Sequence, residues 1–120
     1  MALSALSSSV FALDYELDAP KLRTDADIMY CTDGLRLKVI DKKFAYGQVE
    51  IIANSMRWDQ KQNVLFMSGD ISVLSNEYTL RADHMGFDVS KQTGEAWNVD
   101  LNILDGKNRT RIHCERILIS

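Results

Sequence analysis

Apolar and polar residues alternate along long stretches of the chain. The alternation is strict over Leu35–Val39 and over residues 97–103, and it is shorter over Val49–Ala53 and residues 71–73. Strict alternation places every second side chain on the same face, which is typical of a β-strand with one buried face. Almost no segment carries the apolar stripe of an amphipathic helix. The pattern therefore predicts an all-β, predominantly antiparallel protein.

Polar and glycine-containing steps separate the alternating segments. Asp33-Gly34, residues 59–63 and Asp105-Gly106 predict turns, and the last of these predicts a hairpin. The segment at residues 68–70 has a central glycine and predicts a bulge or a corner, where glycine relieves backbone strain. The side chains expected to point inward are Leu35, Leu37, Val49, Ile51, Val64, Phe66, Ile71, Val73, Val99, Leu101 and Ile103.

One supersecondary unit occurs twice within residues 49–104. Matching residues recur at an interval of about 29 positions, which lies in the range typical of stacked repeats. A weaker copy begins at Leu22, where residues 22–25 resemble residues 80–83. The alternative is an ordinary antiparallel meander in which the matches arise by chance. The matching pairs are Ala53 with Ala82, Met56 with Met85, Trp58 with Phe87, Asp59 with Asp88, Ile71 with Val99 and Val73 with Leu101.

Length and composition fit one globular domain. The chain has 120 residues, of which 46% are hydrophobic and 26% are charged, and its net charge is −3. This size suffices for one modest core. The lysine and arginine residues form no basic cluster along the sequence, which argues against a nucleic-acid partner.

Residues 1–12 differ from the rest of the chain. They are small, apolar or hydroxylated, carry no charge and end in Val10-Phe11-Ala12. This composition resembles the apolar region and cleavage site of a secretory signal peptide, with cleavage after Ala12, although the basic region in front is missing. The other interpretation is a disordered tail. We expect a signal-peptide remnant at residues 1–12, a single domain at residues 13–120 and a location outside the cytoplasm.

Candidate catalytic and metal-binding groups are sparse. His113 and Cys114 are adjacent, and neighbours on a strand point to opposite faces, so they cannot form a nucleophile–base pair. Asp83, His84 and Asp88 combine one histidine with two carboxylates at turn positions, which is typical of solvated surface. The sequence has no glycine-rich phosphate loop and no serine nucleophile elbow. We therefore expect a protein that is not an enzyme, with no catalytic residue, no metal and no cofactor.

The two cysteines, Cys31 and Cys114, lie near opposite ends of the chain. In a stack of strands such ends are far apart, whereas a disulfide needs Cα atoms within about 7 Å. We expect both thiols to be free and at least partly buried. A site formed by Cys114 with His84 would require the fold to bring the two side chains together.

The repeated unit resembles a motif of the OstA-like family of periplasmic proteins, which includes the lipopolysaccharide-transport proteins LptA and LptC and the N-terminal domain of LptD. The resemblance covers residues 49–119, with residues 22–39 as a weaker copy. One departure is that Trp97-Asn98 replaces the glycine of the first copy. The first copy of the motif consists of Ile51, Ala53, Asn54, Met56, Trp58, Asp59, Gly69, Ile71 and Val73, and the second of Leu80, Ala82, Asp83, Met85, Phe87, Asp88, Asn98, Val99 and Leu101.

The resemblance implies an antiparallel β-jellyroll, or β-taco, of stacked strand repeats around an apolar groove. It also implies a non-enzymatic domain in the periplasm or at the outer membrane, which shields the acyl chains of lipopolysaccharide during transport to the outer membrane. The implied partners are lipopolysaccharide or another acylated lipid, and related β-jellyroll proteins that pair through edge strands. The residues expected to form the lipid groove are Leu37, Val49, Ile51, Trp58, Val64, Phe66, Ile71, Val73, Leu80, Phe87, Val99, Leu101, Ile103 and Ile112.

Two further features concern partners. Arg81, Arg109 or Arg111, taken to lie near strand ends, are the expected contacts of an anionic head group outside the groove. Residues 117–120 (Ile-Leu-Ile-Ser) leave an apolar edge, as expected either for a fragment of a longer protein or for an edge that docks on another β-protein. The alternative function is a structural β-sandwich assembly module without lipid cargo.

Overall fold

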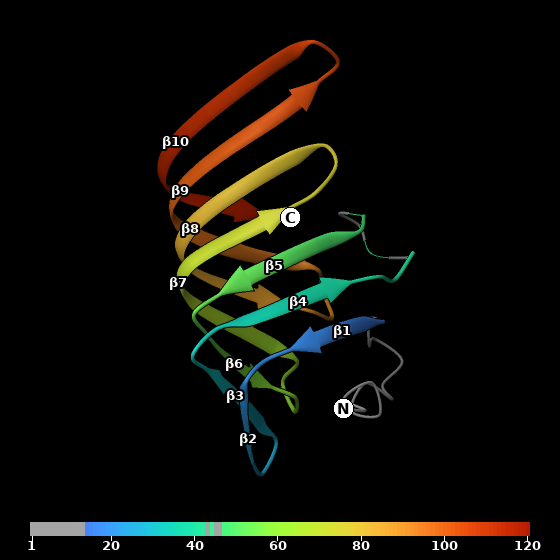
Figure 1. Ribbon diagram of the computed structural model, residues 1–120, viewed down its shortest axis with the longest axis vertical. Helices are drawn as coiled ribbons and strands as arrows, with labels where there is room; N and C mark the ends of the chain where they lie inside the picture. The colour runs from blue at the N-terminus through green and yellow to red at the C-terminus, as the bar shows by residue number, and fades with distance from the viewer. Residues whose placement is uncertain (1–13, 43, 45–46) are drawn as a thin grey trace.

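Ten strands form one antiparallel sheet that curls around its own apolar face (Figure 1). The computed structural model describes residues 14–42, 44 and 47–120, so the expected signal-peptide remnant lies outside the described residues. The described residues contain strands and turns, and none of them belongs to a helix that could cross a membrane. The predicted all-β, antiparallel jellyroll-like fold is confirmed. The strands are β1 (Tyr15–Asp18), β2 (Lys21–Asp25), β3 (Ile28–Thr32), β4 (Leu35–Val39), β5 (Val49–Ala53), β6 (Ser55–Asp59), β7 (Val64–Leu74), β8 (Tyr78–Asp88), β9 (Thr93–Asp105) and β10 (Asn108–Ile119).

The sheet is folded along a corner into two arms, which we call arm A and arm B. Strand β7 crosses this corner, because its residues 72–74 pair with β5 and its residues 64–68 pair with β6. Strands β8, β9 and β10 cross the corner in the same way. Arm A contains β1, β4, β5 and residues 71–74, 78–82, 99–105 and 108–114. Arm B contains β2, β3, β6 and residues 64–68, 84–88, 93–97 and 116–119.

The corner is built from residues that accept a left-handed backbone. Gly69 (φ 82°) and Asp70 (φ 46°) interrupt β7 where its pairing with β8 shifts register. Asn98 (φ 55°) interrupts β9 at the same line, and its Nδ2 donates a hydrogen bond of 2.9 Å to Oδ2 of Asp83 on β8. Asparagine is among the residues that tolerate positive φ best after glycine. Asn98 therefore takes over the role that Gly69 has in the first repeat.

Glycine is required at position 69 by space as well as by backbone angle. The backbone N–H of Asn54 donates to the carbonyl oxygen of Gly69 at 2.9 Å, which brings the two chain segments close together. A Cβ atom on Gly69 would lie 2.6 Å from Nδ2 of Asn54, closer than non-bonded atoms can approach. The bulge or corner predicted at residues 68–70 is confirmed.

The corner explains the sequence repeat. Ala53 and Ala82 are the last inward residues before the corner, and Met56 and Met85 follow it. The weak copy expected at residues 22–25 aligns differently with the other two copies. Leu22 lies in the same cross-strand row as Met56, because both residues pair with Cys31 of β3. Leu22 thus corresponds to Met56 and not to Leu80, which precedes the corner.

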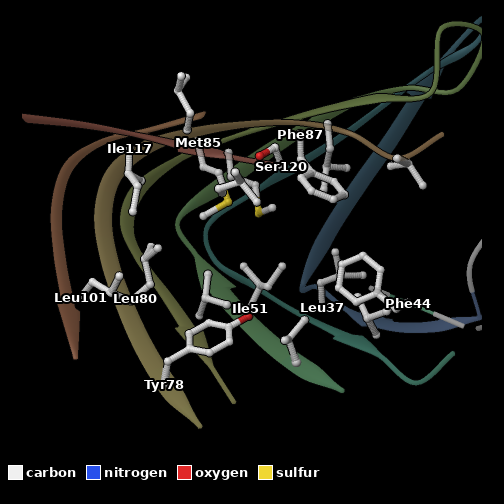
Figure 2. A pocket seen from close by; sticks show the side chains of 18 of the residues that line it. Leu37, Phe44, Ile51, Tyr78, Leu80, Met85, Phe87, Leu101, Ile117 and Ser120 are labelled. Atoms are coloured by element: carbon white, nitrogen blue, oxygen red, sulfur yellow. The ribbon is translucent and has the colours of Figure 1, made fainter. Parts of the chain in front are cut away.

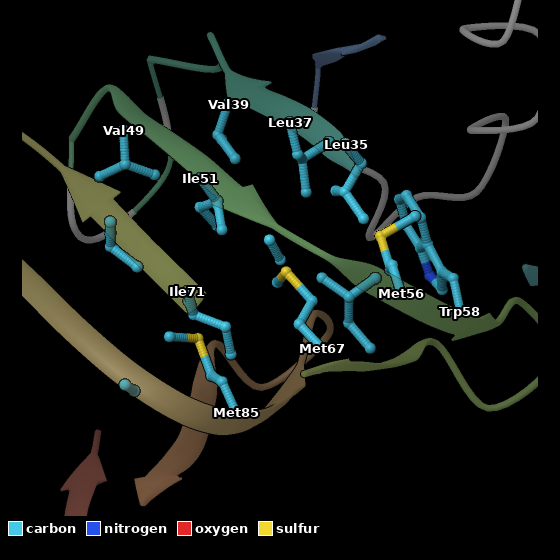
Figure 3. Packing of buried hydrophobic residues seen from close by; sticks show 14 of the residues in the cluster. Leu35, Leu37, Val39, Val49, Ile51, Met56, Trp58, Met67, Ile71 and Met85 are labelled. Carbon is cyan, nitrogen blue, oxygen red and sulfur yellow. The ribbon is translucent and has the colours of Figure 1, made fainter. Parts of the chain in front are cut away.

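Buried apolar side chains pack in the angle between the two arms (Figure 3). Ala53, Ala82 and Ala96 are buried there, together with Ile71 and Val99, which are 1% and 0% exposed. Met56, Met67 and Met85 are also buried beside the corner, in the first inward row of arm B. The aromatic side chains of Trp58 and Phe87 lie in the next inward row, farther from the corner.

The predicted inward face of β7 before the corner is wrong. Leu65 and Met67 are buried, whereas Phe66 is 46% exposed and Val64 shares its outward face. Residues 64–67 are all apolar, so no alternation marks the buried side. The neighbouring strand β8 decides which side of β7 is buried. Phe66 pairs with Gly86 on the outer face, and the Phe66 ring lies 3.3 Å from the position that a Cβ atom on Gly86 would occupy. An aromatic side chain that covers a glycine of the adjacent strand is a known stabilising arrangement in sheets.

Substitution of Asn98 by valine is expected to destabilise the protein by about 1 to 3 kcal/mol, because a β-branched residue is strained at positive φ. The change also removes the hydrogen bond to Asp83. Urea denaturation measures the effect. Asn98→Gly is the matched control and should cost less, because glycine adopts this backbone without strain. Equal stability of the valine and glycine variants would contradict the corner geometry.

Candidate functional site

The two arms enclose an apolar trough with a volume of about 400 Å³ (Figure 2). Pockets for small ligands commonly range from about 300 to 1,000 Å³. Side chains of arm A and arm B point into the trough from opposite sides. It is lined by Tyr15, Leu37, Val39, Phe44, Val49, Ile51, Trp58, Leu65, Met67, Val73, Glu77, Tyr78, Leu80, Met85, Phe87, Val89, Leu101, Ile103, Ile117, Leu118, Ile119 and Ser120.

The wall on arm A is a row of directly opposed residues. Antiparallel pairing places opposed side chains on the same face of the sheet. Because this row crosses β4, β5, β7, β8, β9 and β10 in turn, it forms an uninterrupted apolar surface. The row consists of Leu37, Ile51, Val73, Leu80, Leu101 and Ile112.

The wall on arm B is made of two parallel rows. Trp58, Leu65 and Phe87 form the row farther from the corner. In the row nearer the corner, Met67, Met85 and Ile117 line the trough, whereas Met56 and Ala96 of the same row are buried and do not line it. Methionine side chains are flexible and polarisable, which suits a surface that must adapt its shape.

The structure brings most of the expected groove residues together. Val64 and Phe66 face away from the trough, for the reason given above. Ile71 and Val99 lie beneath it in the corner core. Ile112 continues the row of arm A beyond Leu101 and is 39% exposed. The expected residues that line the trough are Leu37, Val49, Ile51, Trp58, Val73, Leu80, Phe87, Leu101 and Ile103.

Several lining residues were not predicted from the sequence. The alternation at residues 15–17 and 35–39 indicated that Tyr15 and Val39 face inward. The Met56–Met85 repeat indicated the same for Met85. No pattern pointed to Leu65 or to Met67, because both lie in a uniformly apolar run. The residues missed are Tyr15, Val39, Phe44, Leu65, Met67, Glu77, Tyr78, Met85, Val89, Ile117, Leu118, Ile119 and Ser120.

The trough offers no cation to a ligand. Its lining contains no lysine, arginine or histidine among the described residues, and its one acidic side chain is Glu77, in the turn between β7 and β8. Burial raises the pKa of the Tyr15 hydroxyl, so this group stays neutral at physiological pH. Nε1 of Trp58 donates to Oδ1 of Asn63 at 3.3 Å, so the polar atom of the indole is already engaged. The arrangement favours an uncharged apolar ligand and disfavours an anionic group inside the trough.

Aromatic contacts join the arms on the side of the trough nearest β1. The ring of Tyr15 on arm A lies 5.0 Å from that of Trp58 on arm B, measured between centroids. The rings of Phe44 and Phe87 meet edge to face at 6.0 Å. Aromatic pairs at such distances and tilts are attractive beyond the area they bury. These contacts close one end of the trough.

The expected head-group arginines lie at different distances from the ends of the strands. Arg81 is in the middle of β8, next to the corner, and faces outward because its neighbours Leu80 and Ala82 face inward. Its expected position near a strand end is therefore wrong. Arg109 and Arg111 lie at the start of β10, on the outer face of the edge strand.

The groups considered for catalysis or metal binding remain separate. Cys31 is buried and free, and burial raises the pKa of its thiol; Cys114 is half-buried and free, as expected. Cys114 pairs with inward-facing Val99, whereas His84 pairs with Trp97 on the outer face, so the two side chains are on opposite sides of the sheet. Within residues 14–42, 44 and 47–120, no three His, Cys, Asp or Glu side chains gather to hold a metal ion.

The resemblance to the OstA-like motif rests on the two repeats of residues 49–104. In structural terms these repeats are strands bent at a shared corner, with a row of apolar side chains on either side of it. No protein-family model matches the chain, and no curated protein matches it in sequence.

Proposed function

We propose that this chain is a non-enzymatic periplasmic domain that shields the acyl chains of lipopolysaccharide, or of another acylated lipid, on the way to the outer membrane. The observation that carries the proposal is the uninterrupted apolar row from Leu37 to Leu101, which forms one wall of a trough without cationic side chains and continues to Ile112. Such a surface matches a chain of methylene groups and provides no polar group to orient a reacting substrate.

The energetics favour reversible binding. Burial of an acyl chain gains about 0.8 kcal/mol per methylene, so about ten buried methylenes gain about 8 kcal/mol. Association costs about 4 to 15 kcal/mol in lost translational and rotational freedom. The balance corresponds to weak affinity, which suits a domain that must release its cargo to the next carrier.

The head group of the lipid remains outside the trough. An anionic phosphate would meet Glu77 at the margin and no cation in the lining. Arg109 and Arg111 lie on the edge strand β10, close to the open side of the trough, and neither makes an ion pair with a described residue. Their side chains face outward, so an anionic group would meet them only by projecting past the edge of β10.

The edge strand β10 is the proposed contact with a neighbouring β-jellyroll. It pairs with β9 along one side, and no other described strand pairs with it. It spans 12 residues without proline, and long unpaired edges are templates for strand addition. A partner strand added here would extend the row that ends in Ile112 and cover side chains that are exposed in this chain.

Charges on the two edges of the sheet are complementary. Arg109 and Arg111 face outward on β10, and Glu16 and Asp18 face outward on β1 at the opposite edge. Both strands lie in arm A and run toward the corner. When copies are stacked head to tail, β10 of one lies parallel to β1 of the next, and the cations meet the carboxylates. A second copy of this chain therefore fits the edge, as does a related β-jellyroll with an acidic first strand.

A photo-crosslinking amino acid placed at Leu65 or Leu101 is expected to capture lipopolysaccharide, because both side chains line the trough. Placed at the adjacent residues Phe66 or Asp100, it is expected to capture little, because both face outward. The yield of lipid-linked protein on a denaturing gel is the measurement. Each pair of neighbours is its own control for expression and folding.

Equal capture at inward and outward positions would contradict lipid binding in the trough. Absence of capture at every position would favour the structural assembly module, in which the β10 edge pairs with another β-protein and no lipid is carried. Capture confined to Leu65 and Leu101 is the result that supports the proposal.

A further inference from the structure

The trough has two unlike ends. Near β4 its wall is buried, with Leu37 and Val39 at 3% and 6% exposure. Near β10 the same face opens to solvent, with Ile103 and Ile112 at 36% and 39% exposure. The exposure of the wall therefore rises from the first strands of the sheet to the last.

The closed end is formed by Tyr15 and Trp58. The two rings contact each other across the trough, and both side chains are more than nine-tenths buried. Behind Trp58, on the adjacent strand β3, Met29 and Cys31 are 0% and 1% exposed and do not line the trough. The space behind Trp58 is thus already filled by side chains, so a chain-like ligand that reaches the pair cannot continue toward β3.

We propose that the trough takes a single acyl chain tail first from its β10 end, and that the Tyr15–Trp58 pair is a stop that limits the length of chain accepted. This inference rests on the proposed function and specifies the orientation and length of its ligand. The terminal methyl group contacts the two rings. The head group stays at the β10 end, outside the trough.

The distance between the stop and the open end suits one membrane-lipid chain. From β6, which carries Trp58, the sheet continues through β7, β8 and β9 to β10. At about 4.8 Å between neighbouring strands, this path is about 19 Å long. One leaflet of acyl chains fills about 15 Å, half of the hydrocarbon thickness of a bilayer. The volume of about 400 Å³ lies toward the small end of ligand pockets, which favours one chain over several.

The stop predicts how affinity depends on chain length. Each methylene that enters the trough strengthens binding about fourfold, as expected from its transfer free energy. Once the tail reaches Tyr15 and Trp58, a further methylene must displace the rings or leave the head-group end exposed. Affinity should then stop rising with length.

The two tryptophans of the chain provide a direct test of orientation. Trp58 lines the trough, whereas Trp97 faces outward and is 37% exposed. In Trp97→Phe, fluorescence comes from Trp58 alone. We expect a fatty acid brominated at its tail to quench this signal strongly, and the same fatty acid brominated beside the carboxylate to quench it little. In Trp58→Phe, where Trp97 remains, neither probe should quench appreciably.

The length limit is tested by titrating the wild-type protein with saturated fatty acids from octanoate to octadecanoate. We expect the affinity to rise about fourfold per methylene and then to level off within the series. In Tyr15→Leu, which removes one ring and keeps an apolar side chain, the plateau should move to longer chains. Tyr30→Leu is the matched control, because Tyr30 faces outward against Arg23 and should leave the plateau unchanged.

The outcomes separate this inference from the proposed function. Stronger quenching by the bromine beside the carboxylate, or equal quenching by both probes, overturns tail-first entry while leaving lipid binding intact. A rise in affinity that continues through octadecanoate, or an unchanged plateau in a folded Tyr15→Leu variant, overturns the stop. Failure of every fatty acid to bind overturns both this inference and the proposed function. The quenching test uses only Trp→Phe substitutions, so it does not depend on the folding of the Tyr15 variant.

Discussion

Replacement of Val99 by aspartate is expected to remove most of the stability of the protein. Val99 is fully buried in the corner between the arms, where no described side chain is a buried polar or charged group. An unpaired carboxylate in such a place costs about 3 to 5 kcal/mol, out of a total stability of about 5 to 15 kcal/mol. Thermal denaturation followed by circular dichroism measures the loss.

Ile103→Asp is the matched control for this prediction. It makes the same kind of change on the same strand and the same face, but at a residue that is 36% exposed. The control should lose far less stability, because its carboxylate reaches water. Acidification should restore part of the stability of the Val99 variant, because a protonated carboxyl is less costly to bury than an ionised one. Similar melting temperatures for the two variants would show that the corner is not a closed core.

Exchange of the charges on the two edges is expected to control head-to-tail association. One variant carries Arg109→Glu and Arg111→Glu, and the other carries Glu16→Lys and Asp18→Lys. Each variant alone would place like charges opposite one another at the junction, and its self-association should weaken about tenfold or more. Analytical ultracentrifugation of each variant beside the wild-type protein gives the measurement.

Mixing the two variants is expected to restore association, because each edge then meets an edge of opposite charge. A protein carrying all four substitutions should associate with itself again, since both edges are reversed together. Association of the wild-type protein should weaken as salt concentration increases, because exposed charges are screened. If all of these proteins associate equally, the charges do not specify the junction. If only the wild-type protein mixed with a different β-jellyroll associates, the partner is that protein and not a second copy.

Many of the strands and turns could be predicted from the sequence. Alternation over Leu35–Val39 and Val49–Ala53 identified both the strands and their buried faces, because side-chain direction along a strand repeats every two residues. The Asp105-Gly106 hairpin was also correctly predicted, since Gly106 has a positive φ (61°) and Asp105 pairs with Asn108. These features depend on residues close together in the chain.

The buried face of residues 64–67 required the tertiary structure. Four consecutive apolar residues fit either face equally well, so the sequence contains no alternation that selects one. Pairing of Phe66 with Gly86 on the outer face, and of Leu65 with Trp58 and Phe87 on the inner face, selects the observed register. The prediction of Val64 and Phe66 as groove residues failed for this reason.

By itself, the sequence determined an all-β chain with two related units and an apolar inner face, because period-two patterning and turn chemistry are local properties. The tertiary structure alone decided that Asn98 and Gly69 lie on one corner, and that Tyr15 meets Trp58 across the trough. Residues so far apart along the chain are brought together only by the register of the strands between them. Hydrophobic patterning is non-directional and specifies that a side chain is buried, whereas strand register and backbone angles specify which other side chains it meets.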